Sequence, residues 1–253
     1  MRSIEIMLFG VCAWIAVVPS NADESPERWK CAVFLRSVVT EHGTTSVVTG
    51  SGFLLRVNGR EYLVTADHIA RLTTENTQVL VSARSKYLNL HLEDLGYSDS
   101  NPWLRMAGYD IAVLPIHGAL LADALFIASE CCQTELPAIK TELEFVGFPF
   151  ALGVSEGRDL APIVVDGRVA SQEMNASLND SINRAIVCTP SIADGTSGGP
   201  VFGRAPAGQW KLVGIAVGKL VDPTGAKLAK VASARVILAL AANHAATQGS
   251  ESQ

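Results

Sequence analysis

A serine between glycines is the residue of this chain with the clearest potential for chemistry. Ser197 lies in the run GTSGGP at residues 195–200. Glycines permit backbone angles that other residues avoid, and they let a substrate approach the main chain closely. Pro200 lacks a backbone donor and disfavours a helix that begins at Ser197. The run therefore predicts a tight turn that presents a nucleophile and is followed by a strand.

Two further residues could activate that serine, which needs a base because its hydroxyl is a poor nucleophile at neutral pH. His68 comes two residues after the apolar run 62–66, where a rigid strand gives way to a loop. Asp110 opens the apolar run 111–115, and a charge at the mouth of a buried strand needs a partner. Taken singly, such a histidine is more often structural, and such an aspartate more often caps a turn. The three together favour a Ser-His-Asp arrangement.

At this point the chain resembles the chymotrypsin-like serine proteases. The three motifs that carry the resemblance are TADH at 65–68, YDIAVL at 109–114 and GTSGGP at 195–200. The similarity is stronger to trypsin-like peptidases of the HtrA/Deg type, through TGSGFL at 49–54, VGFP at 146–149 and GRVAS at 167–171. It extends over about residues 31–240, and the combination of motifs is specific.

The resemblance implies a serine endopeptidase that works through an acyl-enzyme, without a cofactor or a metal. His68 would be the general base, Asp110 its orienting carboxylate and Ser197 the nucleophile. The backbone N–H groups of Gly195 and Ser197 would form the oxyanion hole. Protein or peptide substrates would lie along a strand edge formed by Ile215, Ala216, Val217 and Gly218.

Two departures from the trypsin pattern affect activation and specificity. Thr196 stands where trypsin-type enzymes carry an aspartate, so activation by insertion of a new N-terminus is not expected. Ser191 would form the floor of the specificity pocket, and without an acid there cleavage after Lys or Arg is not favoured. We expect small or medium apolar side chains at P1. We also expect no PDZ domain after Leu240.

The fold class expected from this sequence is all-β, with two six-stranded antiparallel barrels of the chymotrypsin-like type and a C-terminal α-helix. The strands of the first group are expected at 31–40, 46–57, 61–66, 78–83, 87–92 and 110–116. Those of the second are expected at 142–148, 163–171, 185–189, 201–203 and 210–217, followed by a helix at 233–246. The first barrel would occupy residues 29–130 and the second, with the helix, residues 131–248.

The first 22 residues are typical of a signal peptide. Arg2 precedes an apolar run at 7–18, and the sequence SNA at 20–22 gives a small-x-small cleavage site. We expect a secreted or periplasmic protein with no stable membrane insertion after cleavage; a retained membrane-surface anchor is the alternative. The net charge of −5 and the absence of a basic stripe argue against nucleic-acid binding.

Four cysteines follow the leader, which itself holds Cys12. An even count in an exported protein predicts disulfides. Neighbouring cysteines rarely bridge each other, so Cys31 would pair with either Cys131 or Cys132, and Cys188 with the other. Buried free thiols are the alternative interpretation.

Two other functions fit parts of the sequence. The run 195–199 also matches the GxSxG turn of α/β-hydrolases, with Asp222 and His244 following in the right order. That turn leads into a helix, which Pro200 disfavours, and no β/α alternation precedes it. The second rival is a protease fold kept as a catalytically silent binding protein.

Overall fold

Long antiparallel pairings build the first sheet of this computed structural model, which describes residues 26–250 except 42, 85, 156–158 and 177–182. Strand β1 (Ala32–Glu41) pairs along its whole length with β2 (Thr44–Val57), from Ala32 opposite Phe53 to Glu41 opposite Thr44. Both strands carry apolar side chains where they enter the core and become exposed toward their shared turn. The predicted signal peptide, residues 1–22, lies outside the described residues.

The first sheet has eight strands in the order β5-β4-β1-β2-β3-β7-β6, with β8 pairing with β2. Besides β1 and β2, its strands are β3 (Arg60–Thr65), β4 (Gln78–Ser82), β5 (Tyr87–His91), β6 (Leu104–Arg105), β7 (Ala112–Ile116) and β8 (Ile127–Ala128). The single-turn helix α1 (Asp67–Ala70) follows β3. Short 3₁₀ turns lie at Pro26–Cys31, Glu93–Leu95, Gly118–Leu121, Ser129–Cys131 and Pro149–Ala151.

The second sheet closes into a barrel in the order β12-β13-β16-β15-β14-β9. Its strands are β9 (Glu142–Gly147), β12 (Ile163–Asn175), β13 (Arg184–Thr189), β14 (Pro200–Arg204), β15 (Trp210–Val221) and β16 (Lys227–Ser233). A two-stranded ribbon, β10 (Val154–Ser155) and β11 (Asp159–Leu160), lies outside the barrel, and helix α2 (Ala234–Ser250) ends the described chain.

The predicted all-β fold with a closing helix is confirmed, but the first sheet has eight strands where six were expected, and five strands were missed: the two-residue strands β6, β8, β10 and β11, and the longer β16. Strand β16 was not expected, because its sequence KLAKVAS is rich in residues with low strand propensity. It forms because the turn at 222–225 folds it back onto β15, and β13 pairs with its other edge. The predicted helix at 233–246 is present and runs on to residue 250. In the connector at 118–134, the structure has 3₁₀ turns in place of α-helix.

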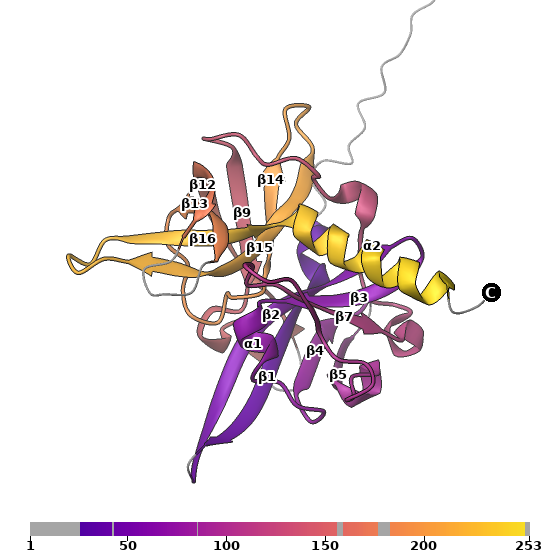
Figure 1. Cartoon of the computed structure of the whole chain (residues 1–253). Coiled ribbons are helices and arrows are strands. Elements are labelled where there is room, and N and C mark those ends of the chain that lie inside the picture. The colour runs from indigo at the N-terminus through magenta and orange to yellow at the C-terminus, as the bar shows by residue number, and fades with distance from the viewer. Residues whose placement is uncertain (1–25, 42, 85, 156–158, 177–182, 251–253) are drawn as a thin grey trace, which may run out of the picture.

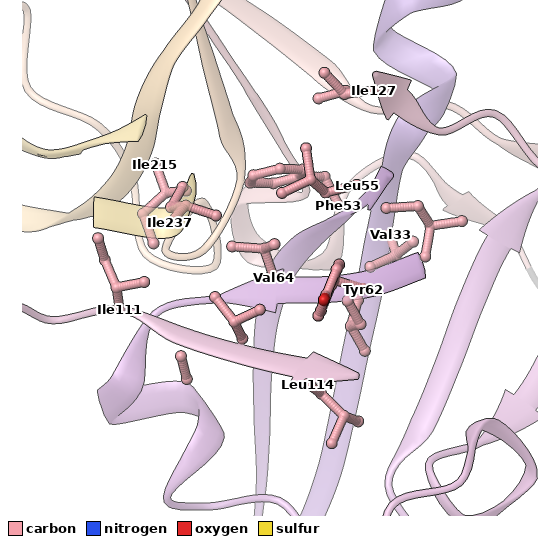
Figure 2. Packing of buried hydrophobic residues seen from close by; sticks show 14 of the residues in the cluster. Val33, Phe53, Leu55, Tyr62, Val64, Ile111, Leu114, Ile127, Ile215 and Ile237 are labelled. Atoms are coloured by element: carbon pink, nitrogen blue, oxygen red, sulfur yellow. The ribbon is translucent and has the colours of Figure 1, made fainter. Parts of the chain in front are cut away.

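The core joins the two halves of the molecule. Figure 2 shows Ile215 of β15 and Ile237 of α2 packed beside Phe53 and Val64 of the first sheet, in one apolar cluster. Helix α2 runs from the barrel across strands β3 and β7 (Figure 1), and the Tyr62 hydroxyl donates to the carbonyl of Ala241 at 3.1 Å. A second cluster fills the inside of the closed barrel. The two halves of the molecule are therefore joined by one shared apolar cluster.

The expected disulfides are not borne out among the described residues, where all four cysteines are free thiols. Cys31 and Cys132 belong to the large shared cluster, whereas Cys188 belongs to the cluster inside the barrel. Burial raises the pKa of Cys132 and that of Cys188 to about 12, and it raises the pKa of Cys31 as well. Of these four cysteines, only Cys131 is exposed. The free-thiol alternative therefore describes this structure.

Candidate active site

His68 lies on the single turn of α1, immediately after strand β3. The neighbouring Asp67 anchors this turn, because its carboxylate pairs with Arg71 at 2.7 Å and with Arg105 at 2.6 Å. Ile69 on the other side is buried against Gly50, where an added Cβ would lie 2.8 Å from its side chain. The imidazole itself is 45% exposed. The residues on either side of His68 therefore anchor the backbone, while the ring remains accessible to solvent.

Asp110 holds His68 through both carboxylate oxygens. Its Oδ2 lies 2.7 Å from the imidazole Nδ1, and its Oδ1 accepts the backbone N–H of His68 at 2.9 Å. Burial alone would raise the pKa of Asp110, but the hydrogen bonds and charge of His68, together with the charge of Lys230, lower it overall. The Asp110 side chain is therefore an anion at neutral pH and only 11% exposed.

The loop of Asp110 is also tied to the second barrel. The backbone N–H of Arg184, at the start of β13, donates to the carbonyl of Gly108 at 2.8 Å. Gly108 has a φ of +81°, and the N–H of Tyr109 closes a turn onto Met106 at 3.2 Å. The turn places Asp110 just before the start of β7, beside α1, as the buried run that follows it predicted.

Ser197 lies where the two halves meet. Its carbonyl accepts the backbone N–H of Ser51 in β2 at 2.8 Å, and the N–H of Gly198 donates to Ala216 of β15 at 2.7 Å. A Cβ on Gly198 would collide with Ser51 and Thr65, and it would lie 3.0 Å from the nitrogen of Ala66. Ala66 is two residues before His68, so the serine loop packs against the strand that carries the histidine. Within the described residues, the imidazole of His68 is hydrogen-bonded to Asp110, and no hydrogen bond links it to the Ser197 hydroxyl.

The two predicted oxyanion donors are available. Among the described residues, neither the N–H of Gly195 nor that of Ser197 donates a hydrogen bond to another group. Gly195 has a φ of +92°, a left-handed value that favours glycine. The carbonyls of the same two peptide groups do have partners. Phe150 N–H donates to the carbonyl of Asp194, and Gly199 N–H donates to the carbonyl of Thr196, both at 2.9 Å. Both N–H groups thus remain available as donors, which an oxyanion hole requires.

The residues predicted to contact substrate lie on β15 and in the segment between β13 and β14. Ala216 pairs with the serine loop, since its N–H also donates to the carbonyl of Gly199 at 3.0 Å. Ile215, Ala216 and Val217 are buried, and the pairing with β16 shifts register between Ala216 and Gly218. Ser191, between β13 and β14, is half-buried, and its hydroxyl reaches only its neighbour's carbonyl, at 3.4 Å, within the described chain. Lys219 of β15 forms an ion pair of 2.9 Å with Asp194 of that same segment.

This combination of loop, histidine and carboxylate agrees with a comparison against known families. The model of the trypsin-like peptidase domain matches residues 50–215, which is more than half of the chain. The chain belongs to the trypsin-like peptidase domain family. It is therefore a member of a family of peptidases, as the motifs indicated. No curated protein matches the chain.

Solved structures share the fold of this trypsin-like peptidase at low identity. The MamO protease domain from Magnetospirillum magneticum is 19% identical, with 85% of this chain and 97% of that chain covered and a TM-score of 0.56. The HtrA-type protease AlgW with a tripeptide is 17% identical, with 83% and 58% covered and a TM-score of 0.54. The active form of the Rv3671c protease from M. tuberculosis is 15% identical, with 87% of each chain covered and a TM-score of 0.53. At these identities the similarity establishes the two-barrel fold.

Three residues near the site were missed by sequence reasoning. Ser51 contacts the serine loop, Lys230 places a positive charge near Asp110, and Phe150 is 68% exposed beside Asp194 with a φ of +53°. A buried serine within an apolar strand signals that a hydrogen-bond partner exists. Lys230 lies on the unpredicted strand β16, so no sequence argument placed it.

Proposed function

We propose that this trypsin-like peptidase is a serine endopeptidase that uses Ser197, His68 and Asp110. The observation that carries the proposal is the double hydrogen bond between Asp110 and His68, at 2.7 and 2.9 Å, beside the packed serine loop. Oδ2 of the carboxylate accepts a hydrogen bond from Nδ1–H, so Nε2 carries the free lone pair of the neutral ring. A base with that tautomer is ready to accept the proton of a serine hydroxyl.

The reaction would then run in two halves. His68 takes the proton of Ser197 as its Oγ attacks the scissile carbonyl, and the resulting oxyanion accepts hydrogen bonds from Gly195 N–H and Ser197 N–H. The protonated His68 gives its proton to the leaving amine as the C–N bond breaks. The amine departs, and the acyl group remains bound to Ser197 as an ester. Water, activated by the same histidine, hydrolyses the ester and restores Ser197. Asp110 stays ionised throughout and stabilises the imidazolium.

The substrates would be proteins or peptides with a small or medium apolar side chain at P1. Ser191 carries no charge that could pair with Lys or Arg, which supports this preference. Of the strand from Ile215 to Gly218, the part at Val217 and Gly218 would pair with the substrate backbone, because both backbone groups of Ala216 are already bonded to the serine loop. We further propose that the protein is exported and acts in a secreted or periplasmic location. The described residues contain no helix long and apolar enough to cross a membrane.

Labelling with a fluorophosphonate probe tests the proposed chemistry, since the probe reacts with activated serines. The wild-type chain should be labelled, Ser197→Ala should not, and the modified peptide should contain Ser197. Ser37→Ala is the matched control, because Ser37 is a buried serine that bonds Thr77 at 2.9 Å, away from the site. It should be labelled as the wild type is. An unlabelled wild type, or equal labelling of Ser197→Ala, would favour a catalytically silent binding protein instead.

A further inference from the structure

Ser51 is a fully buried serine that reaches from the first sheet into the loop of Ser197. Its hydroxyl donates to the carbonyl of Gly195 at 2.7 Å and accepts the N–H of Phe148 at 2.9 Å. Its backbone N–H donates to the carbonyl of Ser197 at 2.8 Å. The residue is 0% exposed, and its own carbonyl accepts the Thr65 hydroxyl at 2.7 Å. Two of these four hydrogen bonds, one from the side chain and one from the backbone, are therefore made to the serine loop.

These bonds fix the peptide groups that flank the two oxyanion donors. The N–H of Gly195 belongs to the peptide whose carbonyl is that of Asp194, and Phe150 N–H holds that carbonyl at 2.9 Å. The next carbonyl, that of Gly195, is held by the Ser51 hydroxyl. Glycine adopts positive and negative φ about equally well, so Gly195 has little intrinsic preference for its φ of +92°. Hydrogen bonds on both sides of Gly195 supply the preference that the residue itself lacks.

We propose that Ser51 is a positioning residue for the oxyanion hole. Its hydroxyl anchors the Gly195 carbonyl, so that the N–H groups of Gly195 and Ser197 stay directed at one point in front of the serine. Ser51 comes from the first sheet, whereas the donors belong to the loop before β14. The hole is therefore assembled only when the two halves of the molecule are docked. The inference rests on the proposed function, because it assigns Ser51 to that same site.

Ser51→Ala removes the hydroxyl and leaves the backbone contacts of residue 51 in place. Loss of a whole oxyanion donor costs about 10²–10³ in kcat. Loss of an anchor leaves both donors present but less well directed, so we expect kcat to fall about 10- to 100-fold with KM within about threefold. A peptide boronic acid, whose tetrahedral adduct places an oxygen in the hole, should bind more weakly by a similar factor.

The control is Ser37→Ala, which also removes a buried serine hydroxyl, although that hydroxyl has the single partner Thr77 whereas the hydroxyl of Ser51 has two backbone partners. Ser37 is 4% exposed and lies on β1, and Ser37→Ala should lose less thermal stability than Ser51→Ala, which leaves two buried backbone groups without that partner. Ser37→Ala should keep kcat and the boronic-acid affinity of the wild type. If Ser51→Ala does not fold, Ser51→Cys retains a weak donor and should give an intermediate kcat. Equal kcat and equal boronic-acid affinity for the Ser51 and Ser37 variants would overturn the proposal, as would a raised KM with unchanged kcat.

Amide hydrogen exchange separates this proposal from the catalytic one. Peptides covering residues 195–199 should exchange faster in Ser51→Ala than in Ser37→Ala, whether or not the wild type cleaves peptides. Faster exchange in the Ser51 variant of a protein that is never labelled at Ser197 would overturn the proposed function and leave the anchoring contact standing. Unchanged exchange in an active enzyme would overturn the role of Ser51 alone.

Discussion

Replacing Asp110 with asparagine should reverse the tautomer of His68, and the geometry determines how. Oδ1 accepts the backbone N–H of His68 at 2.9 Å, so the amide oxygen of the introduced side chain must take this position to keep that bond. The amide NH₂ then occupies the place of Oδ2, which lies 2.7 Å from Nδ1. An NH₂ group can only donate, so Nδ1 becomes the acceptor and the ring proton moves to Nε2. A protonated Nε2 cannot take the proton of Ser197.

The size of the effect follows from the loss of the base. The wrong tautomer in a Ser-His-Asp site lowers kcat by about 10⁴. At about 1.36 kcal/mol for each factor of ten, this corresponds to about 5.4 kcal/mol of transition-state stabilisation. Substrate contacts are untouched, so KM should stay within about threefold. The fold should survive, because the asparagine keeps the volume of the side chain and the bond to the His68 N–H.

The assay is the steady-state hydrolysis of a peptide substrate with a small apolar P1 residue, beside thermal unfolding of each variant. Glu144→Gln is the matched control, since the Glu144 side chain is also 11% exposed and pairs with Arg28 at 2.7 Å. It changes a buried carboxylate to an amide away from His68, so it should lose stability and keep kcat within about threefold. If Asp110→Asn and Glu144→Gln had similar kcat values, Asp110 would not orient the base.

Three further outcomes are expected. The folded-state pKa of Asp110 is lowered, because the bonds and charge of His68 outweigh burial, so its contribution to stability is present above about pH 4 and disappears as pH falls through that lowered value. The difference in unfolding free energy between wild type and Asp110→Asn, measured with urea, should shrink on acidification; a constant difference would contradict this. Gly198→Ala should lower the free energy of unfolding, measured with urea, by about 2–5 kcal/mol, because the new side chain adds backbone strain and steric overlap. The control Gly59→Ala also has a positive φ but lies in open space, so it should lower that free energy by only about 1–2 kcal/mol. Equal losses for the two variants would exclude the overlap. Iodoacetamide at about pH 8, near the ordinary thiol pKa, should modify Cys131 before the three buried cysteines, as mapped by peptide mass; uniform labelling of the native protein would contradict the burial of the other three.

The local motifs were predictable because each encodes its own turn. The run at 195–200 indicated a glycine turn with a serine, and the structure has positive φ at Gly195 and Gly198. The apolar runs beside His68 and Asp110 indicated rigid strand ends, and both residues lie next to strands of the first sheet. The order of the three residues along the chain then suggested a shared site. Such signals can be interpreted from neighbouring residues alone, without knowing which distant residues pack against them.

The missed features depend on partners that are distant in the sequence. Strand β16 has weak intrinsic strand propensity and forms because β15 and β13 pair with its two edges. The Ser51 hydroxyl bonds a carbonyl 144 residues away, so the sequence could indicate that a partner exists but not which one. The cysteine count favoured disulfides, yet Cys188 lies in a different apolar cluster from Cys31 and Cys132. Each of these outcomes was set by how the two halves pack.

The glycines of the serine loop illustrate the same dependence on packing. A side chain at Gly195 would lie 2.7 Å from the carbonyl of Phe148, and one at Gly198 would overlap the strand that leads to His68. One at Gly199 would overlap the carbonyl of Val146 in β9. Each glycine thus allows a different element to approach the loop, so their spacing reflects three contacts as well as one turn. The glycines of this motif are therefore required by the packing of both halves of the molecule around Ser197 as well as by the local turn. A side chain at any of the three positions should displace the elements that pack against the loop, and the site should lose its geometry for that reason.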